Sequence, residues 1–190
     1  MIEVYPLFLL LRSRLVVVVG GGEVAERKVE GLLAASALVR VVSPSLDRRL
    51  EARSEAGAID VRRRAFDEAD VEDAWLVVAC TDDPSTQERI ASACERRRTF
   101  CLAVDDIQNA TAFGGSVIRR PPFTIALSSS GEAPALTRLL REVLEATLPP
   151  DSFVARARAL RKEWKERGVP MQDRFAELLR AAKDHLSKSM

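Results

Sequence analysis

The chain has 190 residues, of which 47% are hydrophobic and 30% charged, with a formal net charge of +1. This composition is that of a globular protein, and it excludes both a strongly cationic nucleic-acid-binding chain and an acidic disordered tail. The length suits one medium domain with a smaller appendage. No apolar run approaches the roughly 20 residues that a membrane-spanning helix needs, and no signal-peptide pattern is present. We therefore expect a cytoplasmic protein that binds neither nucleic acid nor a membrane.

Short β-branched runs alternate with helical segments in the first half of the chain. The runs cover residues 15–19, 38–42, 59–63, 75–80 and 100–104. Apolar residues at helical spacing follow from Val24 to Leu33, and Pro84 begins a second helical pattern that reaches Arg98. This alternation predicts an α/β fold with a parallel, doubly wound sheet.

The first predicted strand runs directly into a glycine-rich turn. Residues 20–25 read Gly-Gly-Gly-Glu-Val-Ala and fit the pattern G-x-G-x-x-A at a strand-to-helix junction. In this pattern Gly20 permits the tight turn, Gly22 lets the backbone approach a pyrophosphate, and Ala25 allows close helix packing. The residues predicted to bind a dinucleotide here are Gly20, Gly21, Gly22, Glu23 and Val24. The alternative is a tight turn that binds nothing.

The second predicted strand ends without the carboxylate that usually holds the adenosine ribose, about 20 residues after the turn. Ser43, Pro44 and Ser45 stand there instead. Either serine could hydrogen-bond the ribose, whereas the nearby Arg40, Arg48 and Arg49 leave room for a 2′-phosphate, so these residues leave NAD and NADP open. Thr81 and Asp82 follow the fourth strand, and we expect them at the same edge of the sheet.

The pattern changes after Asp105. Strands are predicted at 116–118 and 123–128, separated by a turn at 119–122, and a helix at 134–147 is ended by two prolines. A helical tail with a break at 168–170 follows, and its many basic residues are interpreted as a solvated face. We expect three regions, namely 1–113, 114–148 and 149–190.

Cysteine and histidine supply no metal-binding pattern. Cys80, Cys94 and Cys101 lack metal-ligand spacing and are interpreted as reduced core residues. His185 is the sole histidine of the sequence and stands in no cluster with ligand spacing. We therefore predict no metal site.

Several segments together resemble the precorrin-2 dehydrogenase module of siroheme synthases. They are Tyr5-Pro6-Leu7-Phe8, the string from Gly20 to Lys28, Thr81-Asp82-Asp83, Val104-Asp105, the turn from Ser128 to Pro134, and Arg138-Leu139-Leu140-Arg141. The resemblance implies oxidation of precorrin-2 to sirohydrochlorin with NAD and, in bifunctional members, insertion of ferrous iron as a second substrate. It also implies a homodimer of chains with an NAD-binding Rossmann domain, a small α+β dimerisation region and a helical C-terminal tail.

The resemblance also implies roles for particular residues. Asp105 matches the carboxylate implicated in catalysis, and a carboxylate at the sheet edge could accept the proton that dehydrogenation releases. The alternative is that Asp105 or Asp106 caps a turn. Cations and backbone amides should hold the substrate's carboxylates, and the candidates are Ser128, Ser129, Ser130, Gly131, Arg119, Arg120 and Arg138, with Arg141 as a further arginine. Ser129 also aligns with a serine that family members can phosphorylate.

Two features depart from the family pattern, and other classes of function remain open. Phe113-Gly114-Gly115-Ser116 replaces a Phe-x-x-Pro segment, and Arg119 stands where relatives often carry aspartate. A non-catalytic NAD-sensing Rossmann regulatory protein would share the glycine turn. A different small-molecule oxidoreductase would normally carry a Lys, Tyr or His acid–base group in its catalytic half.

Overall fold

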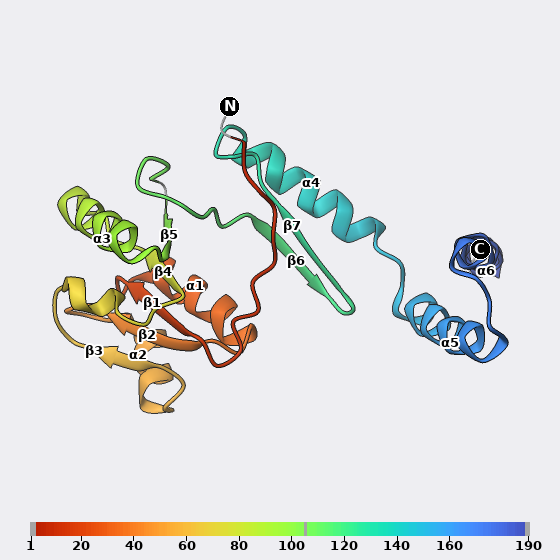
Figure 1. Ribbon diagram of the computed structural model, residues 1–190, viewed down its shortest axis with the longest axis horizontal. Helices are drawn as coiled ribbons and strands as arrows, with labels where there is room; N and C mark the ends of the chain where they lie inside the picture. Colours follow the sequence, from red (N-terminus) through yellow and green to blue (C-terminus); the bar gives the residue numbers. More distant parts are fainter. Residues whose placement is uncertain (1–2, 105, 189–190) are drawn as a thin grey trace. The chain divides into compact units, whose positions relative to one another are not determined.

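The computed structural model describes residues 3–104 and 106–188, which form two compact units (Figure 1). The first, here called the sheet unit, contains the chain up to Gly115 together with Ser128–Ala133. The second, here called the hairpin unit, contains Ser116–Leu127 and the chain from Pro134 onward.

The sheet unit contains five parallel strands in the order β3-β2-β1-β4-β5. Their bounds are Leu15–Val19 for β1, Leu38–Val42 for β2, Asp60–Arg62 for β3, Leu76–Ala79 for β4 and Phe100–Ala103 for β5. The predicted doubly wound sheet is confirmed, although β3, β4 and β5 are shorter than the sequence patterns suggested. The strand order reverses between β1 and β4, and ligands of such sheets bind outside the carboxyl ends at this point.

Helices cover both faces of this sheet, and the valines of β1 belong alternately to the two cores that result. Val16 and Val18 pack with residues of α1 (Glu23–Ala34) and α2 (Arg48–Glu55). Val17 and Val19 pack on the other side with α3 (Pro84–Arg97) and with η1 (Glu68–Val71), a short 3₁₀ helix. All four valines are at most 4% exposed, as expected for a strand that is buried on both faces.

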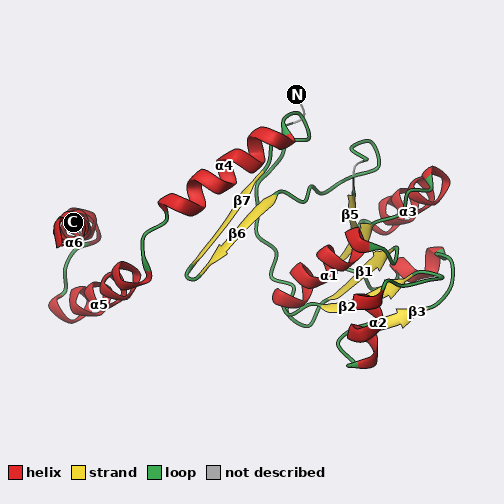
Figure 2. Cartoon of the chain, turned by 180° about the vertical axis from the view of Figure 1, so that it is seen from behind, coloured by secondary structure: helices red, strands yellow, loops and turns green. Residues whose placement is uncertain are grey.

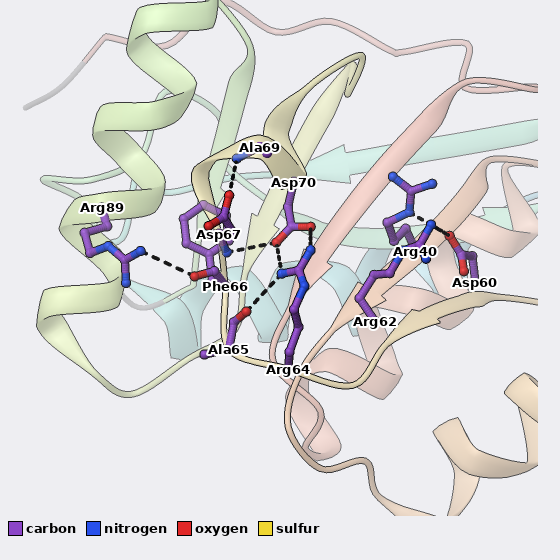
Figure 3. Close-up of polar contacts among 10 residues, drawn as sticks. All are labelled: Arg40, Asp60, Arg62, Arg64, Ala65, Phe66, Asp67, Ala69, Asp70 and Arg89. Carbon is purple, nitrogen blue, oxygen red and sulfur yellow. Dashed lines mark hydrogen bonds and ion pairs between the residues drawn. The ribbon is translucent and has the colours of Figure 1, made fainter.

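Charged residues fill the corner between β3 and η1 (Figure 3). The guanidinium of Arg64 donates two hydrogen bonds to Asp70, at 2.7 and 2.6 Å, and the backbone amide of Asp67 donates a third at 2.9 Å. Burial tends to raise the pKa of Asp70, but these hydrogen bonds and the charges of Arg64 and Arg40 outweigh burial and lower it from its ordinary value of 3.8.

We expect Asp70→Asn to destabilise the sheet unit by about 2 kcal/mol at neutral pH, because a carboxylate held by charged hydrogen bonds is lost. Since folding lowers the pKa of Asp70, its contribution is present above pH 3.8 and disappears as the pH falls through the folded value. Urea unfolding from pH 7 to pH 3 should show the difference between variant and wild type shrinking. Glu68→Gln, which breaks the exposed pair with Arg96, is the control and should cost less than about 1 kcal/mol. An equal cost for the two variants would contradict this account.

In the hairpin unit, β6 (Ser116–Arg120) pairs antiparallel with β7 (Phe123–Leu127), as Figure 2 shows in yellow. The predicted turn at 119–122 is therefore wrong in its first half. Arg119 pairs with Thr124 and Arg120 with Phe123, so both arginines belong to β6 and Pro121-Pro122 alone makes the turn.

The rest of the hairpin unit is helical, as predicted. α4 (Pro134–Thr147) contacts β6, and α5 (Asp151–Arg167) packs against α6 (Met171–Lys188). Trp164 is buried between these last two helices, and its indole nitrogen donates a 2.6 Å hydrogen bond to Glu177.

Cysteines and helix hydropathy agree with an ordinary folded protein. Cys94 and Cys101 are buried, Cys80 is half-buried, and all three are free thiols. Among the described helices, none combines the length and the apolar character needed to cross a membrane.

Candidate functional site

The glycine turn between β1 and α1 owes its residues to close backbone packing. Gly20 has a φ of +123°, a conformation that favours glycine, and a Cβ there would lie 2.3 Å from the carbonyl oxygen of Cys80. A Cβ on Gly21 would lie 1.9 Å from the carbonyl oxygen of Ser45. Gly22 differs, because a Cβ there would meet nothing within 4 Å. The turn is thus closed behind Gly20 and Gly21 and open beside Gly22.

The open side of the turn is the beginning of α1. Gly22 precedes the helix without a side-chain cap, and the first bond of the helix runs from the amide of Glu26 to the carbonyl of Gly22. The amides of the first turn therefore have no partner within the helix, and they point where the helix dipole favours an anion. This cradle fits the pyrophosphate of a dinucleotide.

The loop after β2 closes over Gly21. The amide of Asp47 donates to the carbonyl of Gly21 at 2.7 Å, and the hydroxyl of Ser43 donates to the carbonyl of Ser45 at the same distance. Ser43 is buried with its donor engaged, whereas Pro44 and Ser45 are exposed. Ser45 is therefore better placed than Ser43 to contact a ribose hydroxyl.

A cavity of about 350 Å³ lies beside this loop, lined by Glu23, Asp47, Arg48 and Arg49. The Asp47 carboxylate is engaged in capping α2, since it accepts the amides of Arg49 and Leu50. Arg49 lies 3.7 Å from the carboxylate of Glu26, whose side chain is 3% exposed and also binds Arg53 at 3.0 Å. Arg48 is exposed on the rim of this cavity.

The loop after β4 reaches the same edge of the sheet. The amide of Cys80 donates to the carbonyl of Val19, which fixes Cys80 beside the glycine turn. The next residue, Thr81, is held by the buried Gln87, whose side-chain nitrogen donates to its carbonyl at 2.8 Å. Asp82 is exposed, and Asp83 caps α3 by accepting from Thr86.

Cys80 lacks the environment of a reactive thiolate. Burial raises the pKa of its thiol to about 12, against a smaller lowering by the positive charge of Lys28. The group therefore stays protonated at neutral pH and contributes packing and a backbone carbonyl.

The chain leaves β5 at this edge, where the amide of Val104 donates to the carbonyl of Ala79. Asp105, predicted as the catalytic residue, lies outside the described residues. Its neighbour Asp106 accepts hydrogen bonds from Asn109 and Gln108, and the bond from the Asn109 side chain is the main cause of its lowered pKa. Asp106 thus organises a turn.

The turn from Ser128 to Gly131 belongs to the sheet unit, like the glycine turn. The Ser128 hydroxyl accepts the amide of Ser130, and the Ser129 hydroxyl accepts the amide of Ala133 just before α4. Gly131 has a φ of +82°, and a Cβ there would lie 2.6 Å from the side chain of Ile107. This turn therefore packs against the connection that follows β5.

The predicted substrate-binding arginines belong to the hairpin unit. Arg138 pairs with Glu142 and Arg141 with Glu145, each one helical turn away on α4. Arg120 lies 3.9 Å from Asp151, and Arg119 is exposed. Pairs one helical turn apart are weak at an exposed helix surface, so Arg138 and Arg141 can exchange their partners for a ligand.

A larger cavity, of about 920 Å³, lies at the opposite edge of the sheet. Phe8, Trp75 and Phe100 line it, and the guanidinium of Arg14 stacks 3.7 Å from the Trp75 ring. Ligands of open α/β sheets bind at the carboxyl ends of the strands, so we place the functional site at the smaller cavity.

Sequence reasoning assigned no site role to three residues at the carboxyl edge. Gln87 holds Thr81, Glu26 neutralises arginines behind the glycine turn, and Lys28 extends from α1 toward Gly114. Glu26 and Lys28 lie in the segment from Gly20 to Lys28 that carries the family resemblance, so the resemblance could have pointed to them. Gln87 stands on a predicted helix and gave none.

The model of a protein family described as "Putative NAD(P)-binding" matches residues 7–116. A siroheme synthase of Enterobacter sp. (strain 638) is 42% identical over 144 residues, which cover 76% of this chain and 32% of that protein. Siroheme synthase 1 of Aeromonas salmonicida (strain A449) is 41% identical over 189 residues, which cover 97% of this chain and 40% of that protein. The chain thus spans well under half the length of these curated relatives.

Among solved structures, "SirC, precorrin-2 dehydrogenase" matches with a TM-score of 0.74 and 21% identity, over 95% of this chain and 98% of that one. This likeness confirms the fold, namely the Rossmann-like sheet, the hairpin with its helix and the C-terminal helices. Because the family match covers more than half of the sequence, and the matched segment contains the glycine turn, the chain belongs to this NAD(P)-binding family and is similar to part of the siroheme synthases.

Proposed function

We propose that the protein is an NAD-dependent precorrin-2 dehydrogenase, which oxidises precorrin-2 to sirohydrochlorin in siroheme biosynthesis. The observation that carries the proposal is the glycine turn, closed behind Gly20 and Gly21 and open at Gly22, in a chain 42% identical to a siroheme synthase. The relatives are longer proteins, so the activity of this part is inferred from its own site and from the likeness together.

NAD is the proposed cofactor. The first-turn amides of α1 would hold its pyrophosphate, and Ser45, with Pro44 beside it, would contact the adenosine ribose. Glu23 contributes a carboxylate to the adjoining cavity, which opposes a 2′-phosphate, and Glu26 already engages Arg49. On the nicotinamide side, Thr81, held by Gln87, and Asp82 are the proposed contacts.

The reaction removes two electrons and two hydrogens from the macrocycle. Bound NAD would supply the hydride acceptor, and the remaining proton needs a base from the protein. Asp105 is the proposed base, since it follows β5 directly after Val104, which is bonded to β4 at the carboxyl edge. The products are sirohydrochlorin, NADH and a proton, so atoms and electrons balance.

Substrate carboxylates would be held by the turn Ser128, Ser129, Ser130 and Gly131, and by Arg119, Arg120 and Arg138. Insertion of ferrous iron is a second activity that the likeness to siroheme synthases favours, with iron as a substrate. Among the described residues no group of three or more His, Cys, Asp or Glu side chains is arranged to hold a metal ion. Chelation would therefore depend on groups that deprotonate the macrocycle.

We also propose a cytoplasmic homodimer, with residues 114–148 as its dimerisation region. No residue of α4 is buried within one chain, and Leu136, Leu139, Leu140 and Val143 are each at least 46% exposed. A second copy of the chain would cover this apolar face. Sedimentation equilibrium should give twice the mass of the chain, and a monomer would contradict this part of the proposal.

The test of the function is anaerobic turnover of freshly generated precorrin-2 with NAD or NADP, followed by the absorbance of reduced nicotinamide and of sirohydrochlorin. We expect turnover with NAD and a higher KM for NADP. NAD binding measured by calorimetry without turnover would favour the alternative, a non-catalytic NAD-sensing protein.

A further inference from the structure

Lys28 lies at the carboxyl edge of the sheet, and no carboxylate among the described residues forms an ion pair with it. It stands in the second turn of α1, one residue before the buried Val29, and is itself half-buried. A Cβ on Gly114 would lie 3.2 Å from its ammonium nitrogen and 3.1 Å from a methyl group of Leu102. The ammonium therefore lies close to Gly114, on the connection that leads away from β5.

Two carboxylates that precede Lys28 on α1 lie close to arginines. On α1, Glu23 lies 4.0 Å from Arg27, and Glu26 binds Arg49 and Arg53. Within the described part of the chain, Lys28 forms no ion pair. A half-buried lysine that pairs with none of the described carboxylates has a charge that those residues leave uncompensated. Such a group is expected to meet an anion that arrives with a ligand.

The position along α1 indicates which ligand carries that anion. Lys28 stands six positions after Gly22, so its backbone lies about 9 Å along the helix from the pyrophosphate cradle. Its side chain extends toward Gly114, on the connection that begins with Asp105, and its charge acts on Cys80 at the end of β4. The anion is therefore expected from the molecule to be oxidised, which carries carboxylates, rather than from the dinucleotide.

We propose that Lys28 is a substrate-binding residue whose ammonium takes a peripheral carboxylate of the tetrapyrrole, beside the connection that follows the proposed base. This inference rests on the proposed function and adds to it a cation from the sheet unit. The arginines proposed above as substrate contacts, Arg119, Arg120 and Arg138, all belong to the hairpin unit.

The experiment compares Lys28→Met, Lys28→Arg and the matched control Lys162→Met, an exposed lysine on α5, under the anaerobic assay. For Lys28→Met we expect the KM for precorrin-2 to rise by about 10- to 100-fold, the effect of losing one charged hydrogen bond. The kcat and the KM for NAD should change by less than about threefold, as for loss of uniform substrate binding. Lys28→Arg should recover most of the affinity, and Lys162→Met should match wild type.

Two further readouts distinguish substrate binding from a structural role. Lys28→Met should unfold at the same temperature as wild type or higher, because removing an uncompensated ammonium does not weaken the core. Its affinity for uroporphyrin, a stable tetrapyrrole octacarboxylate, should fall in equilibrium dialysis by the same factor as the KM rises. An unchanged KM for precorrin-2, or a fall in melting temperature together with NAD affinity, would overturn the inference.

Failure of the function itself would be visible separately. If wild type and Lys162→Met both lack turnover, the proposed dehydrogenase is wrong. If both turn over and Lys28→Met matches them, only the role of Lys28 is wrong.

Discussion

Gly22→Ala should leave the protein folded and weaken NAD binding by about 10- to 100-fold, because the added methyl group occupies the side of the turn that the pyrophosphate approaches. Gly22 has φ −90° and ψ −171°, which alanine adopts without strain, and a Cβ there meets nothing within 4 Å. We therefore expect a melting temperature equal to that of wild type or slightly higher, since alanine restricts the unfolded chain. Calorimetric titration of NAD measures the loss.

The neighbouring Gly21→Ala should instead lower the stability of the fold. Its Cβ would lie 1.9 Å from the carbonyl oxygen of Ser45, so the loop after β2 must move. Because that loop also bonds Gly21 through the amide of Asp47, we expect a loss of about 2 to 3 kcal/mol in the free energy of unfolding.

If Gly22→Ala binds NAD as wild type does, the cradle is not the cofactor site.

Asp105→Ala should reduce kcat for precorrin-2 oxidation by about 10²- to 10⁴-fold, the contribution typical of a positioned general base. The affinity for NAD should stay within about threefold of wild type, because Asp105 is not among the proposed NAD contacts. Pre-steady-state formation of NADH measures the chemical step directly.

Asp106→Ala is the matched control for Asp105. Asp106 binds Gln108 and Asn109 within its own turn, so its loss should affect local stability more than kcat. Full turnover by Asp105→Ala would remove the proposed base and leave the alternative that Asp105 only caps a turn.

The sheet could be predicted from the sequence because its strands leave few alternatives. In β1 four consecutive valines are buried, alternating between two cores, and a glycine turn follows directly. A short β-branched run that ends at a glycine turn favours a strand covered on both faces over a buried helix. The breaks at Pro149-Pro150 and Gly168 likewise marked the ends of α4 and α5.

The helices α2 and η1 escaped prediction for a physical reason. In α2 only Leu50 is buried, so the segment has no apolar periodicity, and its beginning is determined by the cap at Asp47. In η1 the capping box of Asp67 and Asp70 plays the same part. Hydrogen bonds to backbone amides define where both elements begin, and the spacing of apolar residues gives no indication of such bonds.

The site was predictable where it depends on local backbone, and hidden where it depends on packing. Gly20 could be assigned to a tight turn, and it has a positive φ. The contact of Gly21 with Ser45 and the approach of Lys28 to Gly114 join segments far apart in the chain. Arg119 and Arg120 were misplaced in a turn because cross-strand pairing, rather than their own propensity, places them in β6.

The most direct test of the account is the stoichiometry of a single turnover. Wild-type protein mixed anaerobically with limiting precorrin-2 and excess NAD should form one NADH for each sirohydrochlorin, with both products appearing at the same rate. Binding of NAD without NADH formation, or sirohydrochlorin formation without NADH, would contradict the claim that this chain transfers a hydride from precorrin-2 to NAD.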